Sequence, residues 1–123
     1  MPSKPTTLTT QELEIMKIVW QLESATVRDV YEAMLKDRKV AYTTVMTMMK
    51  ILEQKKFLRR STTDRAYVYR PAQPKAKVIG AMVREFVNRV FNGSAEPLLV
   101  HLVDEHNLTP EDLDEIAALR RKQ

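Results

Sequence analysis

The chain has 123 residues, a length that suits one compact domain, or one domain with a short dimerisation segment, and excludes a large enzyme. Its composition, with 29% charged and 44% hydrophobic residues, is that of a globular protein rather than a disordered or membrane-spanning one. The sequence has no cysteine and no apolar signal segment at its N-terminus, so we expect a cytoplasmic protein without membrane insertion.

The net charge of +4 is unevenly distributed along the chain. Residues 36–70 contain ten cations and three acids, so this segment carries a charge of +7 and the remainder is net negative. A basic block confined to one part of a folded domain is typical of a surface that binds nucleic acid. A solvated surface rich in lysine is the alternative interpretation of the charge alone.

Two capping boxes predict the first two helices. Thr9 lies three residues before Glu12, and Thr26 lies three residues before Asp29. At this spacing the two side chains each accept a hydrogen bond from the other residue's backbone amide at a helix N-terminus. Apolar residues at helical spacing then extend these helices to about residues 22 and 35.

A third helix is predicted from about Tyr42 to Gln54. Its apolar residues recur at helical spacing and are expected to face the core: Val45, Met48, Met49 and Leu52. The opposite face carries short polar or flexible residues and one cation: Thr43, Met46, Thr47, Lys50 and Gln54. We interpret the methionines as adaptable core residues rather than as metal ligands.

A β-hairpin is predicted after the third helix. Phe57–Arg60 forms its first strand, residues 61–65 form the turn, and Ala66–Arg70 forms the second strand. Three helices followed by a hairpin is the order of the winged helix-turn-helix fold, so the predicted class is mainly α with a small β-hairpin wing. Two prolines in residues 71–74 indicate a linker between a winged-helix domain at residues 1–73 and a helical region at residues 74–123.

The region after the linker is predicted to hold three helices. An apolar stripe over residues 78–91 ends at Asn92 and Gly93, Ser94 is expected to cap the next helix, and Thr109 is expected to cap the last. About fifty residues are too few for a stable core of their own, so a second copy of the chain is expected to cover these stripes. The predicted dimerisation residues are Ile79, Met82, Val83, Phe86, Val87, Val90, Leu98, Leu99 and Leu102.

The predicted third helix stands where a helix-turn-helix protein places the helix that reads the major groove of DNA. The hairpin would serve as a wing whose arginines contact phosphates. The predicted DNA-binding residues are Tyr42, Thr43, Thr44, Met46, Thr47, Lys50, Gln54, Arg59, Arg60 and Arg65. A surface of threonines with one lysine discriminates bases weakly, so specificity is expected to require two copies of this helix in a dimer.

Catalysis and metal binding have little support in the sequence. The chain has no cysteine and only two glycines, which excludes a glycine-rich phosphate loop. His101 and His106 lie five residues apart, on opposite faces of a helix and without an evident partner. We therefore expect no enzymatic activity, no cofactor and no metal. Two alternatives to a DNA-binding repressor stay open: a winged-helix module whose basic face meets an acidic protein, and a small enzyme or metal sensor.

Five blocks of sequence form a distinctive set. They are Leu8-Thr-x-x-Glu12-x-Glu14-Ile15-Met16 with Trp20, Thr26-Val27-Arg28-Asp29-Val30-Tyr31, Ala41-Tyr42-Thr43-Thr44-Val45-Met46-Thr47, Leu52-x-x-Lys55-x-Phe57-Leu58-x-Arg60, and Tyr67-x-Tyr69. Together they resemble the BlaI/MecI penicillinase-repressor family over almost the whole chain. The resemblance implies a dimeric transcriptional repressor with an N-terminal winged helix and a C-terminal dimerisation region, which binds inverted-repeat operators.

The resemblance also implies a means of release. In antibiotic-responsive members of that family, a membrane sensor-protease leads to cleavage of an Asn-Phe bond in the dimerisation region. The matching position in this chain is the bond between His101 and Leu102, which departs from the Asn-Phe pattern. A copper-responsive branch of the family uses cysteine ligands, and the absence of cysteine excludes that mode here.

Overall fold

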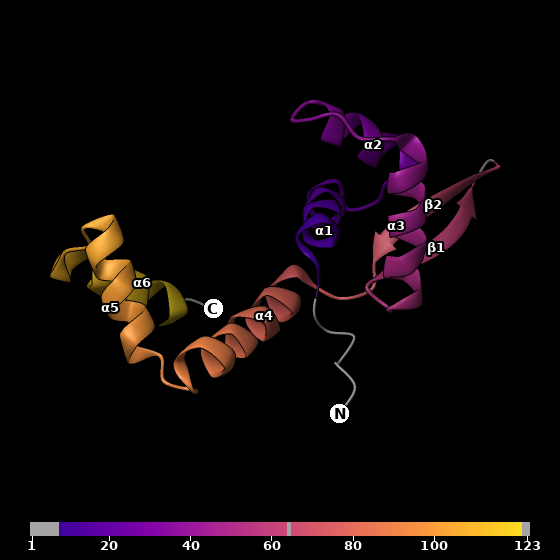
Figure 1. Cartoon of the computed structure of the whole chain (residues 1–123). Coiled ribbons are helices and arrows are strands. Elements are labelled where there is room, and N and C mark those ends of the chain that lie inside the picture. The colour runs from indigo at the N-terminus through magenta and orange to yellow at the C-terminus, as the bar shows by residue number, and fades with distance from the viewer. Residues whose placement is uncertain (1–7, 64, 122–123) are drawn as a thin grey trace. The chain divides into compact units, whose positions relative to one another are not determined.

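Six helices and one two-stranded antiparallel sheet make up the part of the chain that the computed structural model describes, residues 8–63 and 65–121 (Figure 1). In chain order they are α1 (Thr10–Leu22), α2 (Val27–Leu35), α3 (Tyr42–Gln54), β1 (Leu58–Thr63), β2 (Ala66–Pro71), α4 (Lys75–Phe91), α5 (Glu96–His106) and α6 (Pro110–Arg121). This order confirms the predicted class of a mainly helical fold with a hairpin wing. Contacts divide the chain into two units, which meet after Met82 within α4.

Both predicted capping boxes are present. The Thr9 hydroxyl accepts from the backbone amide of Glu12 at 3.1 Å, and the Glu12 carboxylate accepts from the amide of Thr9 at 2.9 Å. Thr26 and Asp29 make the same two bonds at 3.1 and 3.0 Å. These short-range bonds satisfy amides that no helical carbonyl can reach, so the sequence spacing located both helix starts.

The core of the first unit is enclosed by α1, α2, α3 and the hairpin. From α3, Val45, Met49 and Leu52 are completely buried, as predicted, and Met48 packs against them while partly exposed. The core also contains large side chains that the sequence pattern did not single out: Ile15, Phe57 and Tyr69. Burial of each such side chain stabilises the unit by about 1.5–3 kcal/mol, which keeps α3 in a defined position against the other elements.

The hairpin has longer strands than the sequence predicted. β1 and β2 pair in antiparallel register from Leu58 opposite Pro71 to Thr63 opposite Ala66. Residues 61–63, expected in the turn, continue the β1 ladder, because threonine favours the extended backbone of a strand. A backbone bridge joins Ala25 to Tyr69 through hydrogen bonds of 2.9 and 2.8 Å, so the hairpin is tied to the segment before α2.

The first turns of α4 belong to the first unit. Val78 is buried and Met82 packs against the first-unit core, while the Trp20 indole donates to the backbone oxygen of Gln73 at 3.0 Å. The predicted domain boundary at residue 73 therefore coincides with the turn before α4, whereas the packing continues as far as Met82.

The second unit contains the rest of α4 with α5 and α6. Asn92 and Gly93 end α4 with positive φ angles of 53° and 87°, as the sequence predicted. The predicted Ser94 cap is wrong: α5 is preceded by Ala95 without a side-chain cap, and the Ser94 amide bonds to the oxygen of Phe91 in the preceding turn. Thr109 and Asp112 form a third capping box at the start of α6. Within residues 8–63 and 65–121, no helix has the length and apolar character needed to cross a membrane.

Candidate nucleic-acid interface

α3 has the two faces that its sequence predicted. Opposite the buried side, Thr43, Thr44, Thr47, Lys50 and Gln54 are exposed, and Met46 is half-buried. The first turn of α3 has no acidic residue, and its N-cap, Ala41, provides no side-chain hydrogen bond. The backbone amides at this end are therefore left to an external acceptor, and the positive end of the helix dipole favours an anion there.

Tyr42 is held at the start of this exposed face by its neighbours. Its ring packs edge-on against Tyr31 of α2, with 5.4 Å between ring centroids. The guanidinium of Arg28 lies 5.9 Å from the Tyr42 ring centroid and 3.6 Å from the Glu32 carboxylate. Arg28, which sequence reasoning missed, is thus placed beside the predicted reading helix by the adjacent helix.

A cleft of about 480 Å³ is lined by residues of α3, β2 and the start of α2 within the first unit. It brings the predicted residues Tyr42, Met46 and Lys50 together, and it adds Arg28 and Tyr67 from α2 and β2. Its full lining is Thr26, Val27, Arg28, Tyr42, Met46, Lys50, Ala66, Tyr67 and Tyr69. Two cations and no acid line this cleft, so its electrostatic character suits an anionic backbone. Arg28 could have been found from the sequence, because it lies two residues after the capping Thr26, in the first turn of the helix before α3.

The three predicted wing arginines differ in their surroundings. Arg59 and Arg65 are exposed, and Arg65 has a positive φ of 70° between the strands. Arg60 is also exposed, but its guanidinium lies 4.2 Å from the Tyr67 ring centroid, and its Nε lies 3.6 Å from the Glu53 carboxylate. Burial raises the pKa of the neighbouring Tyr69 hydroxyl, with Glu53 acting in the same direction and Arg60 opposing it. Arg60 therefore connects the hairpin to the C-terminal turn of α3.

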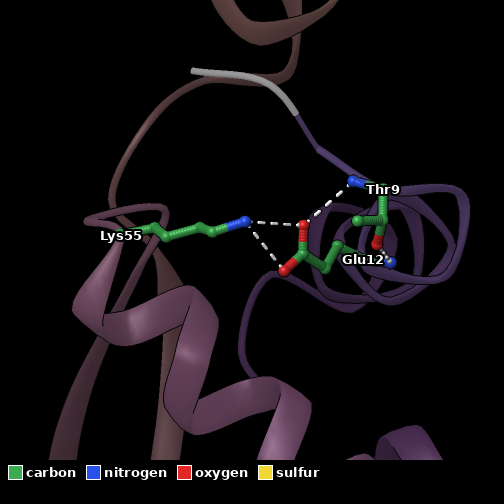
Figure 2. Close-up of polar contacts among 3 residues, drawn as sticks. All are labelled: Thr9, Glu12 and Lys55. Atoms are coloured by element: carbon green, nitrogen blue, oxygen red, sulfur yellow. Dashed lines mark hydrogen bonds and ion pairs between the residues drawn. The ribbon is translucent and has the colours of Figure 1, made fainter. Parts of the chain in front are cut away.

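A partly buried ion pair contacts the end of that C-terminal turn (Figure 2). Lys55, the C-cap of α3, donates to both carboxylate oxygens of Glu12 at 3.0 Å. Burial alone would raise the pKa of Glu12, but hydrogen bonds from Thr9 and the charge and hydrogen bonds of Lys55 outweigh it and lower the pKa. The capping carboxylate of α1 thus also fixes the end of the reading helix, a role that short-range sequence spacing does not reveal.

The predicted dimerisation residues fall into two groups. Val83, Phe86, Val90, Leu99 and Leu102 are exposed. By contrast, Met82 packs against the first-unit core, Val87 is buried, and Ile79 and Leu98 are half-buried. The second unit also exposes large apolar side chains outside that set: Val100, and the stripe of the last helix formed by Leu113, Ile116 and Leu119.

The predicted cleavage position, His101 and Leu102, lies within α5, and both side chains are exposed. The His101 ring lies 6.0 Å from the ring of Phe91. His101 and His106 belong to the same helix, and no group of three potential metal-ligating side chains occurs in the part of the chain that the structure describes. The two histidines therefore have no partners with which to build a metal site there.

Comparison with known proteins agrees with this geometry. A protein-family profile described as Penicillinase repressor matches residues 8–122. The transcriptional regulator BlaI of Mycobacterium tuberculosis is 36% identical over 121 residues, which cover 97% of this chain and 84% of that protein. The penicillinase repressor of Bacillus licheniformis is 27% identical over 105 residues, covering 85% of this chain and 82% of that protein.

A solved structure gives the same result for the first unit. Monomeric BlaI of Bacillus licheniformis, determined in complex with the blaP half-operator, matches 62% of this chain and 92% of its own with 28% identity and a TM-score of 0.52. The fold described above is therefore similar to that of a protein whose structure was solved with operator DNA bound.

Proposed function

The chain belongs to the penicillinase repressor family, and from this premise we propose that it represses transcription by binding operator DNA through α3 and the hairpin wing. The observation that carries the proposal is the two-faced α3, with its polar face open beside a cleft that two cations line. In this arrangement α3 enters the major groove, and the hairpin lies against the adjacent backbone.

The exposed face of α3 contacts the DNA bases in this proposal. Thr43 and Thr47 offer methyl groups to thymine and hydroxyls to base edges or phosphates, and Lys50 reaches guanine acceptors. Thr44 and the free amides of the first turn suit a phosphate near the helix N-terminus. Arg28 and Tyr67 extend the contact surface across the cleft toward the wing.

The protein acts as a homodimer in this proposal. The exposed apolar side chains of the second unit, such as Phe86, Leu99 and Ile116, are the surface that a second copy would cover. Dimerisation also compensates for the weak base discrimination of a threonine-rich α3, because two copies on an inverted repeat contact twice as many base pairs. The two halves of the chain then act together in operator recognition.

Release from DNA is proposed to follow cleavage between His101 and Leu102 in response to a membrane sensor-protease. This bond lies in the middle of α5, so cutting it separates Leu99 from Leu102 and removes part of the exposed apolar surface. A weakened dimer binds two half-sites less tightly. The intact mass of the protein recovered from induced cells tests this step, and an uncut chain that has left its operator contradicts it.

Selection from a duplex library tests the main proposal against its alternative, an acidic protein partner for the basic face. The full chain is incubated with duplexes that contain a random central segment, and the bound fraction is sequenced over several rounds. We expect an inverted repeat to be enriched, with affinity that falls steeply as salt rises. Lack of enrichment over random duplex would favour the protein-interaction module instead.

A further inference from the structure

Two arginines lie directly opposite each other on the hairpin. Arg59 of β1 pairs with Arg70 of β2 in the antiparallel register, so both side chains leave the same face of the hairpin. Alternation along the strands places Arg60 and the buried Tyr69 on the other face. We call the first of these the outer face of the wing, consisting of Arg59, Ser61, Val68 and Arg70.

Like charges directly across a strand pair repel each other, so an anion bound between the two guanidinium groups would be favoured. Among the residues that the structure describes, no carboxylate pairs with Arg59 or Arg70. Both side chains are exposed. Within the described residues, no carboxylate therefore offsets this repulsion.

The outer face also has the shape of a small anion site. Arg70 donates from Nη1 to the Ser61 hydroxyl at 3.3 Å, which holds its guanidinium along the strand. Arg59, Ser61 and Arg70, together with Arg60 from the opposite face, line a depression of about 210 Å³ whose lining has no acidic residue. Guanidinium groups present several donors in a planar fork that matches phosphate oxygens.

Arg60 differs from this pair because its guanidinium already has partners. It stacks on Tyr67 of β2 and forms an ion pair with Glu53 of α3, so it joins three elements of the first unit. A phosphate would have to compete with the Glu53 carboxylate for this group. The position of Arg60 therefore suits a positioning role, in which it sets the angle of the wing against the reading helix.

We propose that the wing arginines have two different roles. Arg59 and Arg70 bind a backbone phosphate of DNA on the outer face, while Arg60 holds the wing against α3. This inference rests on the proposed function and deepens it. It adds Arg70 and Ser61 to the DNA contact surface and gives Arg60 a role other than the phosphate contact expected from sequence.

Salt dependence distinguishes the two roles. The full chain and its variants are titrated into a fluorescently labelled random-sequence duplex at salt concentrations between about 50 and 200 mM, because phosphate contacts do not depend on sequence. We expect Arg59→Gln and Arg70→Gln each to reduce the slope of log affinity against log salt, by at most about 0.9 for each subunit bound, because the two arginines share one phosphate. Arg70→Lys, which keeps a cation, should retain the slope.

The positioning role predicts a different pattern. Arg60→Gln should weaken binding while leaving the salt slope unchanged, and Glu53→Gln should have the same effect. The double variant should bind no more weakly than either single variant, because both remove one contact. Arg120→Gln in α6 is the matched control, an exposed arginine outside the wing whose loss should change neither quantity.

Each outcome bears on a separate claim. If Arg70→Gln has the same slope as Arg120→Gln, the phosphate site is wrong. If Arg60→Gln lowers the slope by the amount expected for a contact, the division of roles is wrong. If the unmodified protein binds duplex without salt dependence, the proposed function itself fails. Thermal unfolding of every variant shows that the comparison is made between folded proteins.

Discussion

Most large apolar side chains of the first unit are buried or half-buried, whereas most of those in the second unit are exposed. In the first, Tyr69, Phe57 and Leu52 are almost completely enclosed by α1, α2, α3 and the hairpin. In the second, Leu99, Ile116 and Leu119 are more than half exposed. The apolar content of the second unit exceeds what its own three helices cover, so its stability depends on what binds it. The packing of the first unit therefore fixes α3 against its neighbours, whereas the exposed apolar surface of the second unit is the surface that we propose a second copy covers.

The largest effect is expected from breaking the proposed pairing. We predict that replacing Val83 and Phe86 together by serine dissociates the dimer and lowers affinity for an inverted-repeat operator by about 100-fold or more, because two linked sites bind as one. Sedimentation velocity and operator titration measure the two effects. Leu35→Ser, at an apolar residue of α2 with 43% exposure, is the matched control. An unchanged dimer in the double variant would contradict the proposed interface.

A substitution in the core tests the difference in side-chain burial between the two units. We predict that Leu52→Ala lowers the free energy of unfolding by about 2–5 kcal/mol, because it leaves a cavity among completely buried neighbours. Leu119→Ala, the same change at a residue with 63% exposure, should cost less than about 0.5 kcal/mol in the monomer. Urea unfolding of both variants measures the difference. Equal losses at the two positions would mean that the second unit has its own closed core.

The partly buried ion pair of Glu12 and Lys55 predicts how stability depends on pH. Glu12 has a lowered pKa in the folded protein, so it binds a proton more weakly there than in the unfolded chain. Its stabilising contribution is present above the ordinary value of 4.5 and is lost as pH falls from there through the lowered pKa. We predict that Glu12→Gln costs about 2–4 kcal/mol near neutral pH, because it leaves Lys55 without its partner.

The control for this prediction is another carboxylate of α1. Glu14 pairs with Arg38 at 2.8 Å but is more exposed than Glu12, so Glu14→Gln should cost less than about 1 kcal/mol. Chemical unfolding is measured at several values of pH for both variants. If the variant that lacks Glu12 keeps the full acid-dependent loss of stability, another group is responsible for it.

The smallest effects are expected on the reading surface. We predict that Thr47→Ala or Lys50→Ala lowers the preference for operator over random duplex by about 1–3 kcal/mol, since both residues are exposed on the face of α3 that we propose contacts bases. Arg65→Ala should weaken binding to both duplexes alike and reduce the salt slope by about 0.9. Parallel titrations with the two duplexes separate these outcomes. Identical behaviour of Lys50 and Arg65 variants would overturn the assignment of faces.

The sequence by itself determined the features that depend on neighbours a few residues apart. The Thr9 and Thr26 capping boxes, the two faces of α3 and the left-handed end of α4 at Gly93 all follow from local hydrogen bonding, side-chain periodicity or backbone freedom. One prediction of this local kind, the cap of α5, was wrong. Ser94 was a plausible cap by type, but the turn after α4 uses its backbone instead.

Only the tertiary structure decided which distant residues share a site. Glu12 and Lys55 are 43 residues apart, and Arg60 acquires Glu53 and Tyr67 as partners only when the hairpin packs beside α3. Arginines that are equivalent in the sequence thus become an anchor or an exposed cation according to strand register. The physical reason is that a one-residue step along a strand reverses the face from which a side chain leaves, and only the packed hairpin shows what each face meets.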